Sequence, residues 1–389
     1  MRHFKYFLFC FITLCWLVEI QATEKKKICL NMIVKNESEV ICRCLASVKP
    51  IIDYWVIVDT GSNDKTQDII REFLKDIPGE LHERKWIDFA HNRNEALNLA
   101  KGKSDYILII DADEVLALDP NYKVPDLDKD FYYIMTQYGG TRYPRLQLVN
   151  NHLDWAWKGV LHETILSDQA KSYGTLLGVT NVVSTDGFRS KDPLKFHKDA
   201  QVLENILKVE PDNARYVFYL ALSYRDAQEH ALALKNFEKR IAMGGWEPEI
   251  FWSLLQIGLL QEALEMPEET IVNSYKKAYH YRPTRVEPLY RLALYYRRKG
   301  NYAEGYKVAK QGIHMPVPED ALFVENWIYD HGLLSEYSIC AYWIEKYTEA
   351  YLASQLLLSN PLLPANFVDC TQKNMEWINK KLAEQQNQL

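Results

Sequence analysis

The chain has 389 residues, with 46 Lys and Arg against 52 Asp and Glu, which gives a formal net charge of −6 at pH 7. This length suits two or three domains of about 150 residues each and excludes a small scaffold held together by disulfides. A charged fraction of 25% is ordinary for a folded protein, and the negative charge offers no basic field for nucleic acid. The aromatic fraction of 13% is typical either of a sugar-stacking site or of helical repeats.

The first residues have the pattern of a secretory signal. A basic start, Met1–Lys5, precedes an uncharged run from Tyr6 to Val18, shorter than the roughly 20 residues that span a bilayer. We therefore expect residues 1–22 to be a signal peptide, with a short signal anchor as the alternative. This places the protein on the secretory route or at a membrane, on a face that the sequence leaves open. Membrane contact is expected only through residues 1–22, if they stay uncleaved.

The cysteines of the remaining chain favour free thiols. They are odd in number and show no paired spacing typical of a disulfide framework or a zinc site. These residues are Cys29, Cys42, Cys44, Cys340 and Cys370.

Strands and helices are expected to alternate over the first part of the chain. Residues 28–34 and 54–59 are apolar runs, each followed by apolar residues at helical spacing. A weaker strand over 81–86 precedes a helix over 90–100, and the apolar run 106–110 ends abruptly in Asp111-Ala112-Asp113-Glu114. Such alternation predicts a Rossmann-like, mainly parallel sheet covered on both faces, with ligands beyond the carboxyl ends of its strands.

Polar residues stand at those strand ends. Glu37 follows the first strand, Asp59 and Asp64 the second, and Asp111 with Asp113 the fourth. Two carboxylates at positions i and i+2 can hold a hard divalent cation that bridges to phosphate oxygens. Arg93, near the start of the third helix, could add a guanidinium fork to the same phosphates. A lone Asp-x-Asp is more often a turn or a cap, so the ordered set of these residues carries the prediction.

Four segments, 32–37, 56–66, 93–96 and 108–114, stand in the order typical of family 2 glycosyltransferases of the GT-A fold, which residues 28–116 resemble. The resemblance implies that Asp59 contacts the nucleotide base and Glu37 the uridine or ribose edge. It further implies that Arg93 contacts the diphosphate side, and that Asp111 with Asp113 forms a DxD site for the donor and a divalent cation, Mn or Mg. Asp64 is grouped with these donor-binding residues.

The stretch Trp157–Glu163 resembles the segment after the DxD in the branch of these transferases that is fused to helical repeats. By that likeness His162 is a third metal ligand and Glu163 the catalytic base, although His162 could equally hydrogen-bond inside the sheet. Inversion in one displacement needs a carboxylate that deprotonates the acceptor. Glu114 and Asp186 are the other candidates, since the usual Glu-Asp pair of the family has no clean counterpart. Trp155 and Trp157 could stack on a sugar, but core packing is the more frequent fate of such a pair.

Beyond residue 193 the pattern becomes helical. The segment Leu220–Arg225 recurs 72 residues later as Leu292–Arg297, two units of about 36 residues and thus close to the 34 of tetratricopeptide repeats. We therefore expect a transferase domain over 26–192, an all-α repeat domain over 193–373 and a polar, fraying tail over 374–389. The concave face of the repeats is expected to bind an acceptor protein or glycan or to mediate self-association, with the oligomeric state left open.

The sequence therefore predicts a metal-dependent, inverting glycosyltransferase that takes a sugar from a nucleotide-sugar donor, most simply a UDP-sugar. The alternative is a binding scaffold with an inactive transferase domain that works through its helical repeats. A nucleotidyltransferase is disfavoured, because the loop after the first strand, Lys35–Ser38, is neither glycine-rich nor basic.

Overall fold

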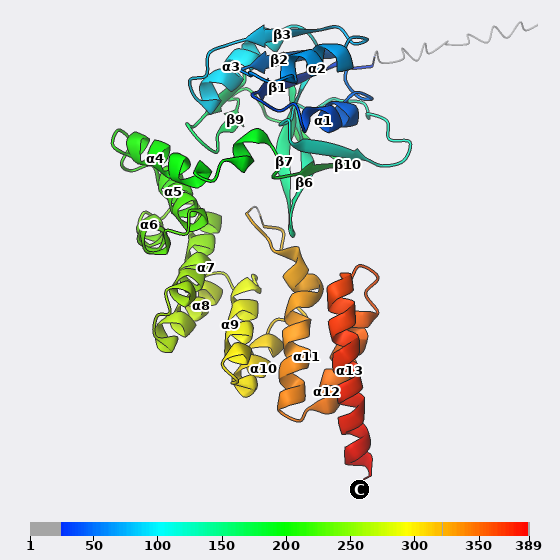
Figure 1. The fold of residues 1–389 in the computed structure, drawn as a ribbon, viewed down its shortest axis with the longest axis vertical. Coiled ribbons are helices and arrows are strands. Elements are labelled where there is room, and N and C mark those ends of the chain that lie inside the picture. Colours follow the sequence, from blue (N-terminus) through cyan, green and yellow to red (C-terminus); the bar gives the residue numbers. More distant parts are fainter. Residues whose placement is uncertain (1–24, 321, 388–389) are drawn as a thin grey trace, which may run out of the picture.

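A computed structural model describes residues 25–320 and 322–387, which form an eight-stranded sheet flanked by helices and a helical array that extends away from it (Figure 1). The predicted signal segment 1–22 lies outside the described residues. Over the described ranges, no helix combines the length and the apolar character needed to cross a membrane. The cysteines predicted to be free thiols are unpaired.

The first half of the sheet follows the predicted alternation. Its elements, in chain order, are β1 (Ile28–Val34), α1 (Ile41–Val48), β2 (Tyr54–Asp59), α2 (Thr66–Phe73), β3 (Gly79–Glu83), α3 (Phe89–Ala100) and β4 (Tyr106–Ile109). The strands pair in parallel in the order β3-β2-β1-β4. Their carboxyl ends therefore meet along one edge, which is where ligands bind in sheets of this kind.

The second half of the sheet adds antiparallel pairs. The remaining strands are β5 (Glu114–Leu118), β6 (Phe131–Tyr138), β7 (Thr141–Asn150) and β10 (Tyr173–Val183), while β8 (Ala156–Lys158) and β9 (Thr164–Leu166) form a separate small hairpin. Strand β7 runs antiparallel to β4 and β6, and β5 antiparallel to β10. The α/β class with a mainly parallel sheet is confirmed, with four parallel pairings in the main sheet against three antiparallel ones.

Both faces of the sheet are covered, because alternate residues of each strand point to opposite sides. Leu30 and Met32 of β1 pack with helix α1 through Leu45, whereas Cys29 packs on the other face with Leu97 of α3. These buried residues fix the strands, and with them the positions of the polar residues at the strand ends.

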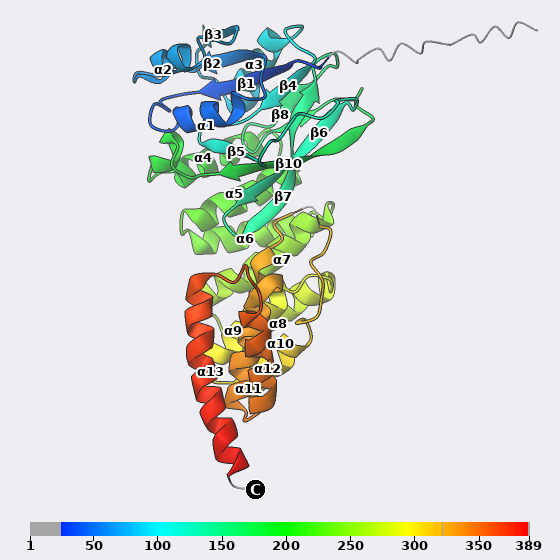
Figure 2. The same cartoon turned by 90° about the vertical axis from the view of Figure 1, so that its right-hand side faces the viewer.

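The rest of the chain is helical, in antiparallel neighbours (Figure 2). After the short 3-10 helix η1 (Phe188–Lys191) come α4 (Lys195–Leu207), α5 (Ala214–Asp226), α6 (His230–Ala242), α7 (Glu247–Ala263), α8 (Glu268–Tyr281), α9 (Glu287–Arg298), α10 (Tyr302–Lys310), a π-helical turn η2 (Ile328–Gly332), α11 (Leu333–Trp343), α12 (Tyr347–Leu358) and α13 (Ala365–Gln386). The two recurring segments lie on α5 and α9, two helix pairs apart, as the repeat predicts.

The sequence predicts a fraying tail over 374–389, but the described part of this segment, up to residue 387, is almost entirely helical. Helix α13 continues to Gln386, because Ile378 is buried and Leu382, one turn later, packs on the same helical core. Two apolar residues at this spacing hold an otherwise polar segment against α11 and α12.

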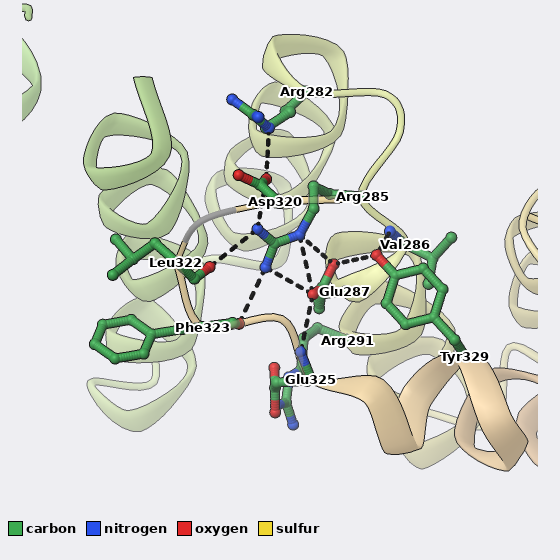
Figure 3. A network of polar contacts seen from close by, with 10 residues as sticks. All are labelled: Arg282, Arg285, Val286, Glu287, Arg291, Asp320, Leu322, Phe323, Glu325 and Tyr329. Carbon is green, nitrogen blue, oxygen red and sulfur yellow. Dashed lines mark hydrogen bonds and ion pairs between the residues drawn. The ribbon is translucent and has the colours of Figure 1, made fainter. Parts of the chain in front are cut away.

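Two features connect distant parts of the chain. The tip of the β6–β7 hairpin reaches the helical part, where Gly140 lies against the ring of Trp327. Within the helices, a buried polar network joins the α8–α9 connection to the segment before η2 (Figure 3). Its centre is Arg285, which donates to Glu287 at 2.7 Å, to Asp320 at 2.9 Å and to the backbone oxygens of Leu322 and Phe323.

Candidate active site

A cavity of about 660 Å³ opens beyond the carboxyl ends of β1 and β4. Four of the predicted site residues line it: Glu37, Arg93, Asp111 and Asp113. The fold thus brings together residues that lie up to 76 positions apart in the sequence, at the sheet edge where parallel strands end.

Asp59 and Asp64 do not line this cavity; they shape the loop beside it. Asp59 is fully buried, and its Oδ1 accepts hydrogen bonds from the backbone N–H groups of Gly61 at 2.8 Å and Ser62 at 2.7 Å. Asp64 accepts from the backbone N–H and hydroxyl of Thr66 and from the backbone of Ser38. Burial alone would raise the pKa of Asp64, but these hydrogen bonds lower it to about 2. Both carboxylates therefore hold the turn between β2 and α2 in shape.

Arg93 lies between two carboxylates. Its Nη2 donates to Asp111 Oδ1 at 2.7 Å and its Nε to Glu163 Oε1 at 2.6 Å, while its guanidinium lies 5.0 Å from the ring centre of Trp157. The arginine is 8% exposed. Two carboxylates thus hold the Nε and Nη2 atoms of Arg93. Since Arg93 also lines the cavity, its contact with the diphosphate side stays a prediction.

A second arginine, Arg145 on β7, also holds the Asp111 carboxylate. It donates to Asp111 Oδ2 at 3.3 Å and forms a closer ion pair with the buried Glu114. Desolvation would raise the pKa of Asp111, but Arg93 and Arg145 lower it, so this carboxylate is ionised. Sequence reasoning did not single out Arg145, because its partners stand more than 30 residues away and only the pairing of β7 with β4 brings them close.

Asp113 and Glu37 form the uncompensated acidic part of the cavity. Burial, reinforced by the charges of Asp111 and Glu114, raises the pKa of Asp113 to about 6. Burial also raises the pKa of Glu37 to about 7, opposed by the backbone N–H of Phe188 and reinforced by Asp113. No described residue forms an ion pair with Asp113. Carboxylates that repel one another in this way favour a cation between them.

The predicted third metal ligand lies elsewhere. His162 adopts a left-handed backbone conformation, with φ 52°, and stacks on Tyr219 of α5 with ring centres 3.9 Å apart. The ranges that the structure describes contain no group of three or more His, Cys, Asp or Glu side chains placed to hold a metal. The trio Asp111, Asp113 and His162 is therefore not brought together, because the Gly159–Glu163 turn directs His162 toward the first helices.

His162 and Glu163 line a second, smaller cavity of about 290 Å³ that meets the large one at Arg93 and Asp111. Trp157 lines this cavity too, whereas Trp155 packs against Phe131 in the core. Of the three carboxylates considered as a base, Glu114 is buried against Arg145 and Asp186 pairs with Arg43. Glu163 is held by an arginine too, Arg93, but of the three it is the one whose side chain lines either of these two cavities.

The segment 187–198 lines the other side of the large cavity, and no sequence pattern predicts its role. It carries four cations: Arg189, Lys191, Lys195 and Lys198. The backbone N–H of Phe188 donates to Glu37 at 3.1 Å, and Gly187 lies against Asp113. Neither a periodic pattern nor a motif marks this connection between β10 and α4, so only the fold reveals it.

The fold is an α/β domain with appended helical repeats, and its large cavity lies beyond the carboxyl ends of the parallel strands. Residues 29–124 match the family model described as "Glycosyl transferase family 2". Over these residues the chain thus has a family 2 glycosyltransferase domain, and tetratricopeptide-like helical repeats follow it.

Known proteins are similar to this chain in sequence or in fold. A TPR repeat-containing protein of Synechococcus elongatus is 28% identical over 74% of this chain and 75% of its own length. The SPbeta prophage-derived glycosyltransferase SunS of Bacillus subtilis is 25% identical over 56% of each chain, so this chain spans little more than half of that relative. The solved structure of a tetratricopeptide repeat protein from Parabacteroides merdae is 15% identical, covering 49% of this chain and 68% of that one with a TM-score of 0.36.

Proposed function

We propose that the protein is a metal-dependent, inverting glycosyltransferase that uses a nucleotide-sugar donor, most simply a UDP-sugar. The observation that carries the proposal is the cavity of about 660 Å³ in which Glu37, Asp111 and Asp113 face a segment rich in lysine and arginine. A volume of this size suits a nucleotide-sugar. The adjoining smaller cavity with Glu163 provides a place for the acceptor beside the donor.

The chemistry of the donor set fits a divalent cation, Mn or Mg. Asp113 has no ion-pair partner within the described residues. Burial, reinforced by the charges of neighbouring carboxylates, raises the pKa values of Asp113 and Glu37. Hard carboxylate oxygens are the ligands that such ions prefer. Asp113 would hold the ion, with Asp111 beside it restrained by Arg93 and Arg145. A bound cation would neutralise the negative charge that develops on the departing diphosphate.

Glu163 is proposed as the general base. The acceptor hydroxyl or thiol loses its proton to the Glu163 carboxylate and forms a bond to the anomeric carbon. The bond from that carbon to the phosphate oxygen breaks, and its electron pair leaves with the nucleoside diphosphate. Arg93 holds Glu163 and Asp111 at a fixed separation, so that base and donor site keep their relative orientation.

The helical repeats are proposed to bind the acceptor, a protein or a glycan. Their first helices adjoin the smaller cavity, since Arg215 of α5 donates to the backbone oxygen of His162 at 2.9 Å. A repeat array provides an extended surface of the kind that binds partner chains. The signal-like pattern of residues 1–22 supports a place on the secretory route or at a membrane.

Release of nucleoside diphosphate from a panel of nucleotide-sugars with Mn or Mg tests the proposal. We expect turnover with a UDP-sugar in the presence of Mn, and none for Asp113→Ala. The matched control is Asp126→Ala, which removes an exposed carboxylate that lines neither cavity. Equal turnover by Asp113→Ala and wild type would contradict the metal site. Absence of turnover together with absence of stabilisation by any nucleoside diphosphate plus Mn would favour the scaffold alternative.

A further inference from the structure

The segment from Asp186 to Lys198 crosses the large cavity opposite the acidic strand ends. It connects the last strand of the sheet, β10, to the first helix of the array, α4, and contributes much of the cavity wall. Residues of the helical part therefore take part in the site that the family 2 domain begins.

Contacts at several points hold this segment in place. Asp186 pairs with Arg43 of α1, and the backbone N–H of Phe188 donates to Glu37 at 3.1 Å. Arg189 pairs with Asp199 of α4 and lies 4.9 Å from the ring centre of Phe89. The cavity wall is thus fixed to both the sheet domain and α4.

Most cations around the cavity already have carboxylate partners. Arg93 is engaged by Asp111 and Glu163, and Arg189 by Asp199. Lys191 pairs with Glu39 at 2.6 Å, and Lys198 pairs with Asp192 at 2.5 Å. These groups balance charge within the protein, so their capacity to bind a further anion is reduced.

Lys195 differs from these cations. Within the described ranges its ammonium group forms no ion pair with a carboxylate, although it lines the cavity and is half-buried. Burial and the charge of Arg189 lower the pKa of Lys195, while the carboxylates of Asp199 and Asp113 attract its ammonium group. The ammonium also lies 5.2 Å from the ring centre of Phe196. Lys35, at the end of β1, also lines the cavity without an ion pair, but it is exposed to solvent.

We propose that Lys195 binds the diphosphate of the nucleotide donor, so that the first helix of the repeat array completes the donor site. The inference rests on the proposed function, since it assumes a nucleoside diphosphate in this cavity. A half-buried ammonium without a carboxylate partner is available for phosphate oxygens, and its charge acts in a less screened environment than that of an exposed lysine. Lys195 transfers no proton; it offsets the negative charge that the diphosphate gains when the bond to the sugar breaks.

The consequence for the molecule is that the transferase domain alone lacks part of its donor site. A chain ending before α4 would keep Asp111 and Asp113 but lose Lys195. The helical array would then contribute to donor binding as well as to the proposed acceptor binding.

The experiment compares UDP with UMP on the full chain, by calorimetry at a fixed Mn concentration. For Lys195→Met we expect affinity for UDP to fall by about tenfold or more, with affinity for UMP changed by less than about threefold, because the second phosphate supplies the extra contact. Lys195→Arg keeps the charge and is expected to retain UDP affinity within about threefold. Lys208→Met removes the same charge from the other end of α4 and is expected to bind both nucleotides as wild type does.

Thermal unfolding of each variant shows that it is folded, and Lys195→Gln provides a second neutral variant if Lys195→Met does not fold. Unchanged UDP affinity in both neutral variants would overturn the inference, as would an equal loss for UDP and UMP. A loss produced by Lys35→Met and not by the Lys195 variants would also overturn it. If the wild type fails to bind UDP, GDP or CDP with Mn, the proposed function itself is overturned. If the wild type binds UDP and the Lys195 variants bind it equally well, only the inference about Lys195 is overturned.

Discussion

Gly187 lies so close to Asp113 that a β-carbon on the glycine would stand 2.8 Å from the Asp113 Oδ2 atom. The contact joins the segment after β10 to the second carboxylate of the Asp-x-Asp pair. Real β-carbons essentially never approach an atom this closely, so any larger residue at 187 must displace the segment or the carboxylate. The position of Asp113 therefore depends on a glycine 74 residues later in the chain.

Gly187→Ala should lower the transferase activity with a small effect on stability. A displacement of about 1 Å in a catalytic group can lower a rate by about 10²-fold, and we expect a loss of this order in kcat/KM for the donor. The measurement is nucleoside diphosphate release, paired with thermal unfolding. The control is Thr185→Ala, an exposed position two residues earlier that does not line the cavity. Activity of Gly187→Ala equal to that of this control would contradict the close contact.

Arg93→Met should destabilise the protein by about 3 kcal/mol, because it leaves Asp111 and Glu163 without their shared cation. The double variant Arg93→Met, Glu163→Gln should recover part of this loss, since the amide carries no charge. Urea unfolding measures both effects. Arg71→Met, an exposed arginine on α2, should change stability by no more than about 0.5 kcal/mol. If the Arg93 and Arg71 variants are equally stable, the ion pairs contribute nothing.

Glu163→Gln separates the two roles that this residue can have. As the general base, its loss should lower kcat by about 10²-fold or more, while donor affinity stays near that of the wild type, because an amide oxygen can still accept from Arg93. Steady-state kinetics and UDP binding provide the two readouts. A variant with unchanged kcat would leave Glu163 as a residue that positions Arg93, and the base would have to lie elsewhere.

The sequence predicted the parts of the fold that rest on local patterns. Long apolar runs at 28–34 and 54–59 became β1 and β2, and the abrupt change at Asp111 marked the end of β4. The acidic side of the cavity was predictable for the same reason, since Glu37, Asp111 and Asp113 stand within four residues of the end of a strand. Helix α13 was not predictable, because its two apolar residues Ile378 and Leu382 stabilise the helix only through their contacts with α11 and α12.

The other side of the cavity depends on contacts between distant segments. Arg145 meets Asp111 because β7 runs antiparallel to β4, with Leu148 opposite Leu108. Lys195 enters the cavity because β10 ends beside α1, where Asp186 pairs with Arg43. Neither of these two contacts can be predicted from residue spacing or composition. The motifs therefore predicted phosphate binding for Arg93, whose side chain also forms ion pairs with two carboxylates.

The contact of the β6–β7 hairpin with the helices should show as coupling between Gly140 and Trp327. A β-carbon on Gly140 would stand 2.9 Å from Trp327 Cδ1, so Gly140→Ala should cost about 1–3 kcal/mol. In a Trp327→Ala background the same change should cost nearly nothing, because the ring is absent. A double-mutant cycle in urea measures the difference. Equal costs in both backgrounds would mean that the hairpin does not touch the helical part in solution.

Arg285→Met should destabilise the helical part through the buried network of Figure 3. Arg285 and Glu287 are both fully buried, and removal of the cation leaves Glu287 without its closest partner, at a cost of about 3–5 kcal/mol. The double variant Arg285→Met, Glu287→Leu should regain much of this loss, because no unpaired charge then stays buried. Urea unfolding followed by circular dichroism at a helix-sensitive wavelength is the measurement, and Arg298→Met, an exposed arginine at the end of α9, is the control. A loss in Arg285→Met that the double variant does not relieve would show that the backbone contacts of Arg285 to Leu322 and Phe323, and not its ion pair, hold this junction together.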